Sequence, residues 1–256
     1  MNIINESLYI AYRLSKKYIS SEDPRHIPLR VQIESTSKCN LRCLECPHSR
    51  EKGAGNHLTV DGLKQILDWL PFKLRNITLS GVGEPLLNPH FFSLVDILAE
   101  RDIACDFYSN GTLISSTMSE AILQRDNITG ISISCDSAEQ NVFEKFRVGA
   151  DFERWMMNIS DFLTNRRDQR HDIRTKMLTV INKENITSLQ DIVHMAADLG
   201  FHSSRFLDPI PIDEQAAAYI PSNSEISSIN FKKMHKTGNS IGVDVTWMIR
   251  RDRVPP

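Results

Sequence analysis

The sequence is short of long apolar runs, of net charge and of cysteine. No apolar stretch approaches the ~20 residues that a bilayer-spanning helix needs, so we expect no membrane partner. Lys and Arg number 30 against 32 Asp and Glu, and this net charge of −2 argues against a nucleic-acid partner. With five cysteines and no basic-then-apolar leader, the sequence predicts a cytoplasmic protein, in which disulfides are rare.

Apolar segments typical of strands alternate regularly with amphipathic segments typical of helices. Strands are expected at residues 30–35, 76–80, 103–108, 130–135, 175–181 and 205–207. Helices are expected to start near Thr59 and at an N-cap Asn88, and a later helix is expected to end at Gly200. Strands that are joined by helical crossovers form a parallel sheet. The sequence therefore predicts an α/β fold, an open partial (β/α)6 barrel, whose functional site lies at the carboxyl ends of the strands.

Three regions are expected along the chain. Residues 1–27 form an N-terminal helical extension, residues 28–208 form the partial barrel, and residues 209–256 form a short irregular C-terminal segment. Within that last segment, a polar helix is expected near 224–236 and a short strand at 243–248.

The strongest motif is a group of three cysteines at C-x3-C-x2-C spacing, Cys39, Cys43 and Cys46, directly after the first expected strand. Iron–sulfur cubanes normally take four cysteine ligands. Three close thiolates without a nearby fourth leave one iron open, as a catalytic metal requires. Two alternatives fit the same segment. Cysteines at this spacing could be small apolar residues on one helix face, and a zinc site could be completed by His48 or His57.

This motif, placed after the first strand of a strand–helix array, resembles the signature of the radical S-adenosylmethionine (SAM) superfamily. Its flanking residues, with Pro47 after the third cysteine, are most similar to the SPASM branch, whose members carry a cysteine-rich C-terminal extension. The resemblance implies a [4Fe–4S] cluster on the three cysteines and SAM chelated to the open iron. It also implies cleavage of SAM to a 5′-deoxyadenosyl radical. Glu45 stands where the family commonly has an aromatic residue, so the resemblance does not extend to an adenine contact there.

The segment Ser80-Gly-Val-Gly-Glu-Pro85 ends the second expected strand and resembles the family's GGEP element. The resemblance implies that Gly81, Gly83 and Glu84 bind the amino group of SAM. Glycine lets a backbone approach a ligand closely, and a carboxylate suits an ammonium group. A plain tight turn is the alternative.

Three further strand ends carry polar residues. The turn at Asn110 resembles the family's T-N-G-x-L turn, which implies that Asn110 lines the SAM cavity, although Asn110-Gly111 is also a good turn pair by itself. Ser134 and Arg147 are implied to lie near the ribose and carboxylate of SAM, since an arginine fork can bind both carboxylate oxygens. Helix capping and surface salt bridging are the alternatives for these two. Asn182 is a further candidate.

The resemblance covers about residues 29–207 and implies a radical SAM oxidoreductase of the maturase type. Its substrate would be a peptide or a small molecule, and its electron donor a flavodoxin or a ferredoxin. The alternatives are a non-catalytic iron–sulfur or zinc-binding module and an inactive, truncated family member. Because no cysteine follows Cys135, we expect no auxiliary cluster, and we expect residues 210–256 to pack poorly, as the start of a truncated extension. Cys105 is expected in the core.

Overall fold

A computed structural model describes residues 30–50, 55–70, 74–169 and 171–249, so the expected helix within 1–27 lies outside the described residues. The chain divides into two compact units. Unit 1 takes in residues 1–40, 52–109 and 121–130, and unit 2 takes in residues 41–51, 110–120 and 131–256. The cysteine loop itself contributes to both units, because Cys39 belongs to unit 1 while Cys43 and Cys46 belong to unit 2.

Seven strands belong to one sheet, in which their order follows the chain from β1 to β7. They are β1 (Arg30–Ile33), β2 (Asn76–Leu79), β3 (Ala104–Ser109), β4 (Ile128–Ser134), β5 (Arg174–Val180), β6 (Ser203–Leu207) and β7 (Asp244–Met248). The strands of the pairs β1–β2, β2–β3, β5–β6 and β6–β7 run parallel to each other. The predicted α/β class is confirmed, and the sheet gains a seventh strand because the expected strand near 243–248 pairs with β6.

Unit 1 contains β1 to β3 with helices α2 (Val60–Trp69) and α3 (Phe91–Glu100). Helix α2 begins after Thr59 as predicted, because the Thr59 hydroxyl accepts a hydrogen bond from the Gly62 amide at 3.1 Å. Helix α3 begins later than predicted, after His90. Asn88, the expected N-cap, accepts from the His90 amide at 2.9 Å through its Oδ1, while its side-chain amide donates to the Ser35 and Leu58 carbonyls at 2.7 and 3.0 Å.

Several short helices lie in the connections between the strands and the longer helices. They are the 3-10 helices η2 (Pro47–Arg50) and η3 (Pro85–Leu87) and the α-helices α4 (Ser116–Leu123), α5 (Gln140–Phe146) and α8 (Glu214–Ala217). Helix η3 explains the late start of α3. It follows Glu84 directly and holds the Asn88 amide through the Pro85 carbonyl at 3.0 Å.

Unit 2 contains the longer helices α6 (Phe152–Asp168) and α7 (Leu189–Leu199). Asp151 caps α6 by accepting from the Arg154 amide at 2.9 Å. Helix α7 ends as predicted at Gly200, whose φ of 85° is the left-handed conformation that glycine favours. The buried ring of Trp155 packs with Phe143 and Phe152 in the core of this unit.

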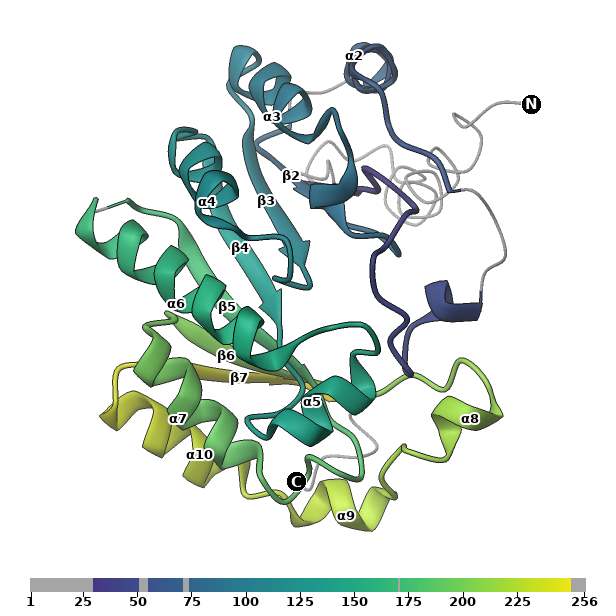
Figure 1. Cartoon of the computed structure of the whole chain (residues 1–256), viewed down its shortest axis with the longest axis vertical. Helices are drawn as coiled ribbons and strands as arrows, with labels where there is room; N and C mark the ends of the chain where they lie inside the picture. Colours follow the sequence, from purple (N-terminus) through teal and green to yellow (C-terminus); the bar gives the residue numbers. More distant parts are fainter. Residues whose placement is uncertain (1–29, 51–54, 71–73, 170, 250–256) are drawn as a thin grey trace, which may run out of the picture. The chain divides into compact units, whose positions relative to one another are not determined.

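The C-terminal segment is more regular than predicted. The expected polar helix is two helices, α9 (Asn223–Ser228) and α10 (Phe231–Ser240), followed by β7. Helix α10 packs against α7 and β7, and these elements lie side by side in Figure 1. Phe231, Met234 and Val245 are buried. The prediction of poor packing is therefore wrong for α10 and β7, because α10 finds its apolar partners within unit 2.

Candidate active site

The turn after β2 in unit 1 packs tightly on the residues that precede Cys39. The Glu84 amide donates to the Lys38 carbonyl at 2.8 Å. A Cβ at Gly83 would lie 2.2 Å from the Thr36 carbonyl oxygen, so only glycine fits there. Sequence reasoning missed Glu34, which follows β1 and accepts a hydrogen bond from the Val82 amide. The sequence feature that could have identified Glu34 is a carboxylate directly after a strand, at the edge of the sheet where the site is expected.

Glu84 itself is buried, with 2% of its surface exposed. Its Oε1 accepts from the Ser109 hydroxyl at 2.9 Å and from the Leu86 amide at 3.3 Å. The carboxylate therefore joins the ends of β2 and β3 and caps η3. These bonds orient the group, and its role toward SAM stays a prediction.

The part of the cysteine loop that lies in unit 2 is held against the end of α5 and the two residues after it, Phe146–Val148, which we call the backing segment. The Arg42 amide donates to the Val148 carbonyl, and the Leu44 amide donates to the Phe146 carbonyl, both at 2.9 Å. The loop then turns, with the Ser49 hydroxyl hydrogen-bonded to the carbonyls of Cys43 and Cys46 at 2.6 and 2.5 Å. The thiols of this loop are half-buried.

This pairing brings charged groups of unit 2 together around Arg147. The buried guanidinium lies 2.7 Å from Asp136, which follows the end of β4. The pKa of Arg147 is affected first by burial, which lowers it, but the charges of Asp136, Cys43 and Cys135 outweigh burial and raise it. The alternative of a surface salt bridge for Arg147 is therefore wrong, because both partners are buried. Sequence reasoning missed Asp136, although it directly follows Ser134-Cys135.

Glu45 and Asn182 complete this group, which we call the Arg147 cluster: Glu45, Asp136, Arg147 and Asn182. Burial, and secondly the charge of Asp136, raise the pKa of Glu45 to about 8, against the opposing effects of Arg147 and Asn182. Three buried polar atoms of the cluster have no hydrogen-bond partner among the described residues: Glu45 Oε1, Arg147 Nε and Asn182 Nδ2. Buried polar atoms are normally paired, so these three are suited to contact a ligand.

Asn110 and Ser134 also lie in unit 2. The Asn110 side chain accepts from the Thr112 amide and hydroxyl at 2.9 and 2.6 Å, and its carbonyl accepts from Trp155 Nε1 at 3.0 Å. Gly111 has a φ of 81°, and a Cβ there would lie 2.5 Å from Trp155 Nε1. The turn is thus held by its own residues and by the ring of Trp155. Ser134 ends β4 and is half-buried.

The two histidines of the zinc alternative are engaged differently. His57 belongs to unit 1, where its Nδ1 lies 2.9 Å from the Thr36 hydroxyl. His48 belongs to unit 2, where its Nε2 lies 2.8 Å from Arg42. Across residues 30–50, 55–70, 74–169 and 171–249, no three His, Cys, Asp or Glu side chains are already gathered as a metal site.

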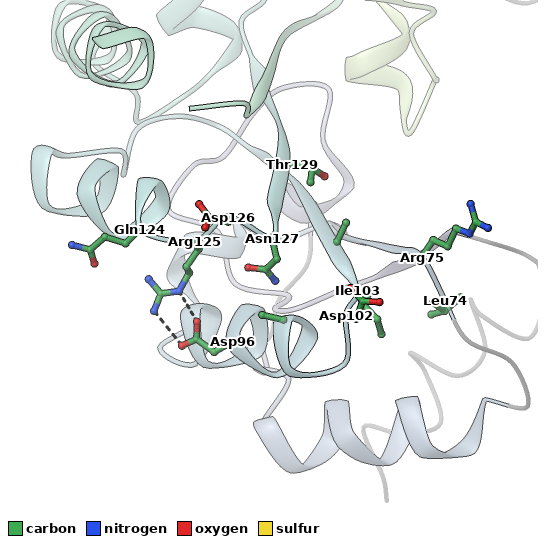
Figure 2. Close-up of a pocket in the computed structure, with 12 residues that line it drawn as sticks. Leu74, Arg75, Asp96, Asp102, Ile103, Gln124, Arg125, Asp126, Asn127 and Thr129 are labelled. Atoms are coloured by element: carbon green, nitrogen blue, oxygen red, sulfur yellow. Dashed lines mark hydrogen bonds and ion pairs between the residues drawn. The ribbon is translucent and has the colours of Figure 1, made fainter. Parts of the chain in front are cut away.

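A separate pocket of about 970 Å³ lies in unit 1 (Figure 2). Its lining includes residues that precede β2, β3 and β4, such as Arg75, Asp102 and Asn127, so it lies at the amino ends of these strands. Arg125 forms an ion pair with Asp96 at 2.7 Å beside it (Figure 2). The pocket contains none of the residues predicted to bind the cluster or SAM.

Comparison with known proteins identifies the family. The model of the Radical SAM superfamily matches residues 33–196, more than half of the chain. The chain therefore belongs to the radical SAM superfamily, whose members use a [4Fe–4S] cluster and SAM. The resemblance seen in the sequence is confirmed, including its similarity to a maturase of the SPASM type.

Individual relatives are more distant. The mycofactocin maturase MftC of Mycobacterium tuberculosis is 25% identical over 173 residues, which cover 68% of this chain and 43% of that protein. A GTP 3′,8-cyclase of Clostridium perfringens is 24% identical over 207 residues, which cover 78% of this chain and 61% of that protein. The chain therefore spans about half of the length of these relatives.

Solved structures show the same fold. The structure of Streptococcus suis SuiB bound to the precursor peptide SuiA matches with a TM-score of 0.70 and 14% identity. The match covers 95% of this chain and 55% of SuiB. SuiB bound to S-adenosylmethionine matches with a TM-score of 0.71. Within the described part of the chain, no helix is both long and apolar enough to cross a membrane.

Proposed function

We propose that this chain is a radical SAM enzyme that uses a [4Fe–4S] cluster to cleave SAM and abstract hydrogen from its substrate. The cluster ligands are Cys39, Cys43 and Cys46, and the SAM-binding residues are Gly81, Gly83, Glu84, Asn110, Ser134 and Arg147. The observation that carries the proposal is the family match over residues 33–196, because it contains all nine residues.

The residues of each unit fit this cofactor pair. The glycine turn of unit 1 has room for no Cβ at Gly83, as expected of a backbone that approaches a ligand closely. In unit 2, Arg147 Nε and Asn182 Nδ2 are buried donors without a hydrogen-bond partner among the described residues, and a carboxylate is the group that an arginine binds best. Half-buried thiols suit a cluster that must be reached by an external electron donor.

When bound, the cluster and SAM supply reductive cleavage of SAM to methionine and a 5′-deoxyadenosyl radical, which takes hydrogen from the substrate. The protein's own part is positional. The backing segment fixes the course of the cysteine loop through two backbone hydrogen bonds. Asp136 holds Arg147 at 2.7 Å, and Ser109 holds Glu84 at 2.9 Å, so both charged groups are oriented before any ligand arrives.

The substrate is a peptide or a small molecule. MftC is a maturase and SuiB is described with a precursor peptide, which favours a peptide. The match to a GTP cyclase, over 78% of this chain, is the observation that keeps a small molecule as the second candidate. Reduction of the cluster by a flavodoxin or ferredoxin, in the cytoplasm, completes the proposal. We further propose that residues 28–208 form the catalytic core, with 1–27 as an N-terminal extension and 209–256 as a C-terminal segment whose strand β7 joins the same sheet.

Anaerobic reconstitution tests this proposal. The protein should bind about four irons and four sulfides, and with dithionite and SAM it should release methionine and 5′-deoxyadenosine. Zinc in place of iron would support the zinc-binding alternative. A normal cluster with no SAM binding would identify an inactive family member. Iron and sulfide of about eight each would contradict the single-cluster expectation.

A further inference from the structure

The connection between β6 and α9 folds back onto the region that supports the cysteine loop, all within unit 2. We call residues 208–222 the strap. It contains Pro209, Pro211 and Pro221, whose fixed φ angles restrict its conformations. Its one helix, α8, is capped by Asp213, which accepts from the Ala216 amide at 2.7 Å.

Tyr219 of the strap contacts the backing segment through its ring. Its ring meets the Phe146 ring edge to face, with centroids 5.1 Å apart and planes at 76°. The Lys145 ammonium lies 5.2 Å from the Tyr219 ring centroid. Phe146 is itself buried, with 2% of its surface exposed. Its ring therefore has little freedom to move unless the Tyr219 ring moves with it.

Lys183, just beyond β5, fixes Tyr219 from the other side. The Lys183 amide donates to the Tyr219 carbonyl at 2.9 Å, and its ammonium donates to the Ala218 carbonyl at 2.8 Å. Next to it, Glu184 forms an ion pair with Lys145. Tyr219 is thus tied by its backbone to the end of β5 and by its ring to the backing segment.

We propose that Tyr219 is a positioning residue for the cysteine loop. Its ring sets Phe146, and the Phe146 carbonyl accepts from the Leu44 amide between Cys43 and Glu45. The same segment carries Arg147 and accepts from the Arg42 amide. Displacing Phe146 therefore shifts the backbone on both sides of Cys43. This inference rests on the proposed function, since it assigns Tyr219 a role in holding the cluster and SAM.

The test replaces Tyr219 and follows both the loop and the iron. Tyr219→Leu removes the aromatic ring, whereas Tyr219→Phe keeps it and removes only the hydroxyl. Ile210→Ala is the matched control, because Ile210 lies in the same strap and is 75% exposed. In the metal-free protein, amide hydrogen exchange at Arg42 and Leu44 should be about 2- to 12-fold faster in Tyr219→Leu. That range is the fold-change equivalent to one aromatic pair. Tyr219→Phe and Ile210→Ala should match the wild type.

After reconstitution, a chelator should remove iron from Tyr219→Leu faster by a similar factor. The electron paramagnetic resonance spectrum of its reduced cluster with SAM should differ from that of the wild type, a change that a general loss of stability does not cause. Unchanged exchange at Arg42 and Leu44 in Tyr219→Leu would overturn the inference, as would a Tyr219→Phe variant that behaves like Tyr219→Leu. A wild-type protein that takes up no cluster would overturn the proposed function, and with it the role of Tyr219. A normal wild-type cluster beside an unaffected Leu variant would overturn the inference alone.

Discussion

The turn at Glu84 in unit 1 and the Arg147 cluster in unit 2 both contain buried charged groups, but they differ in how far the protein supplies hydrogen bonds to them. Glu84 is buried, and its Oε1 already accepts two hydrogen bonds from its own unit. In the Arg147 cluster, three buried polar atoms have no partner among the described residues. The Glu84 oxygen therefore has hydrogen-bond partners within the protein, whereas the Arg147 cluster has more buried polar atoms than partners among the described residues.

Because of this difference, the two sites should affect protein stability and SAM binding to different extents. A buried polar atom without a hydrogen bond costs about 1–3 kcal/mol, so the Arg147 cluster lowers the stability of the metal-free protein. Regions with such costs are commonly functional sites, where a ligand supplies the missing bonds. We therefore expect substitutions at Glu84 to act mainly on SAM affinity, and substitutions at Arg147 to act on stability as well.

The largest effect is expected at the three proposed cluster ligands, of which Cys39 belongs to unit 1 and Cys43 and Cys46 belong to unit 2. Replacing Cys39, Cys43 or Cys46 by Ala should each reduce bound iron from about four per chain to far less and abolish SAM cleavage, because a three-ligand cluster cannot spare one. Iron analysis after reconstitution measures this. Cys105→Ala is the control, since the buried Cys105 thiol should matter only for packing. A Cys43→Ala variant with a normal cluster spectrum would sink the ligand assignment.

Breaking the buried ion pair of unit 2 should come next. Arg147→Met leaves Asp136 buried without its cation, which should lower the free energy of unfolding of the metal-free protein by about 3–5 kcal/mol. Urea unfolding gives the value. Arg101→Met is the matched control in unit 1, because its partner Asp68 is exposed and such pairs contribute about 0–1 kcal/mol. Equal losses at the two sites would remove the distinction drawn between them.

Glu84→Gln sharpens the comparison from the other side. Glutamine keeps an Oε1 that can accept from Ser109 and Leu86 but removes the charge. Loss of a charge-assisted hydrogen bond costs about 1.5–3 kcal/mol, so SAM should bind about 10- to 150-fold more weakly. Iron content and stability should change little. Calorimetry with the reconstituted protein measures the SAM affinity. An unchanged affinity would mean that Glu84 only stabilises the turn.

Local features of this structure were predictable from the sequence, and long-range ones were not. Thr59 and Gly200 were identified as helix ends because capping depends on nearby residues. Asn88 was misplaced because its amide binds carbonyls 30 and 53 residues away. The family motif predicted the three cysteines, but no pattern in the sequence links Leu44 to Phe146 or Asp136 to Arg147. Such pairings depend on how strands and loops meet in three dimensions.

The smallest effect is expected at His202, at the amino end of β6 in unit 2. Its Nδ1 accepts from the Thr175 amide at 3.0 Å, and Arg166 lies 3.0 Å from its Nε2. Burial, and then the charges of Arg166 and Arg174, lower the pKa of His202 below 6.5. The folded state therefore takes up this proton less readily than the unfolded state. The resulting stability is complete above pH 6.5 and is lost as the pH falls toward the lowered pKa.

His202→Asn tests this while keeping an acceptor for the Thr175 amide. Urea unfolding of both proteins at pH 7.5 and 5.5 should show a smaller fall in stability for the variant, and the difference between the two proteins cancels the other titrating groups. Because His202 lies at the amino end of its strand, it is independent of the Arg147 cluster at the carboxyl ends. An identical pH dependence in the two proteins would assign the acid sensitivity of unit 2 to groups other than His202, with the Arg147 cluster as the first to examine.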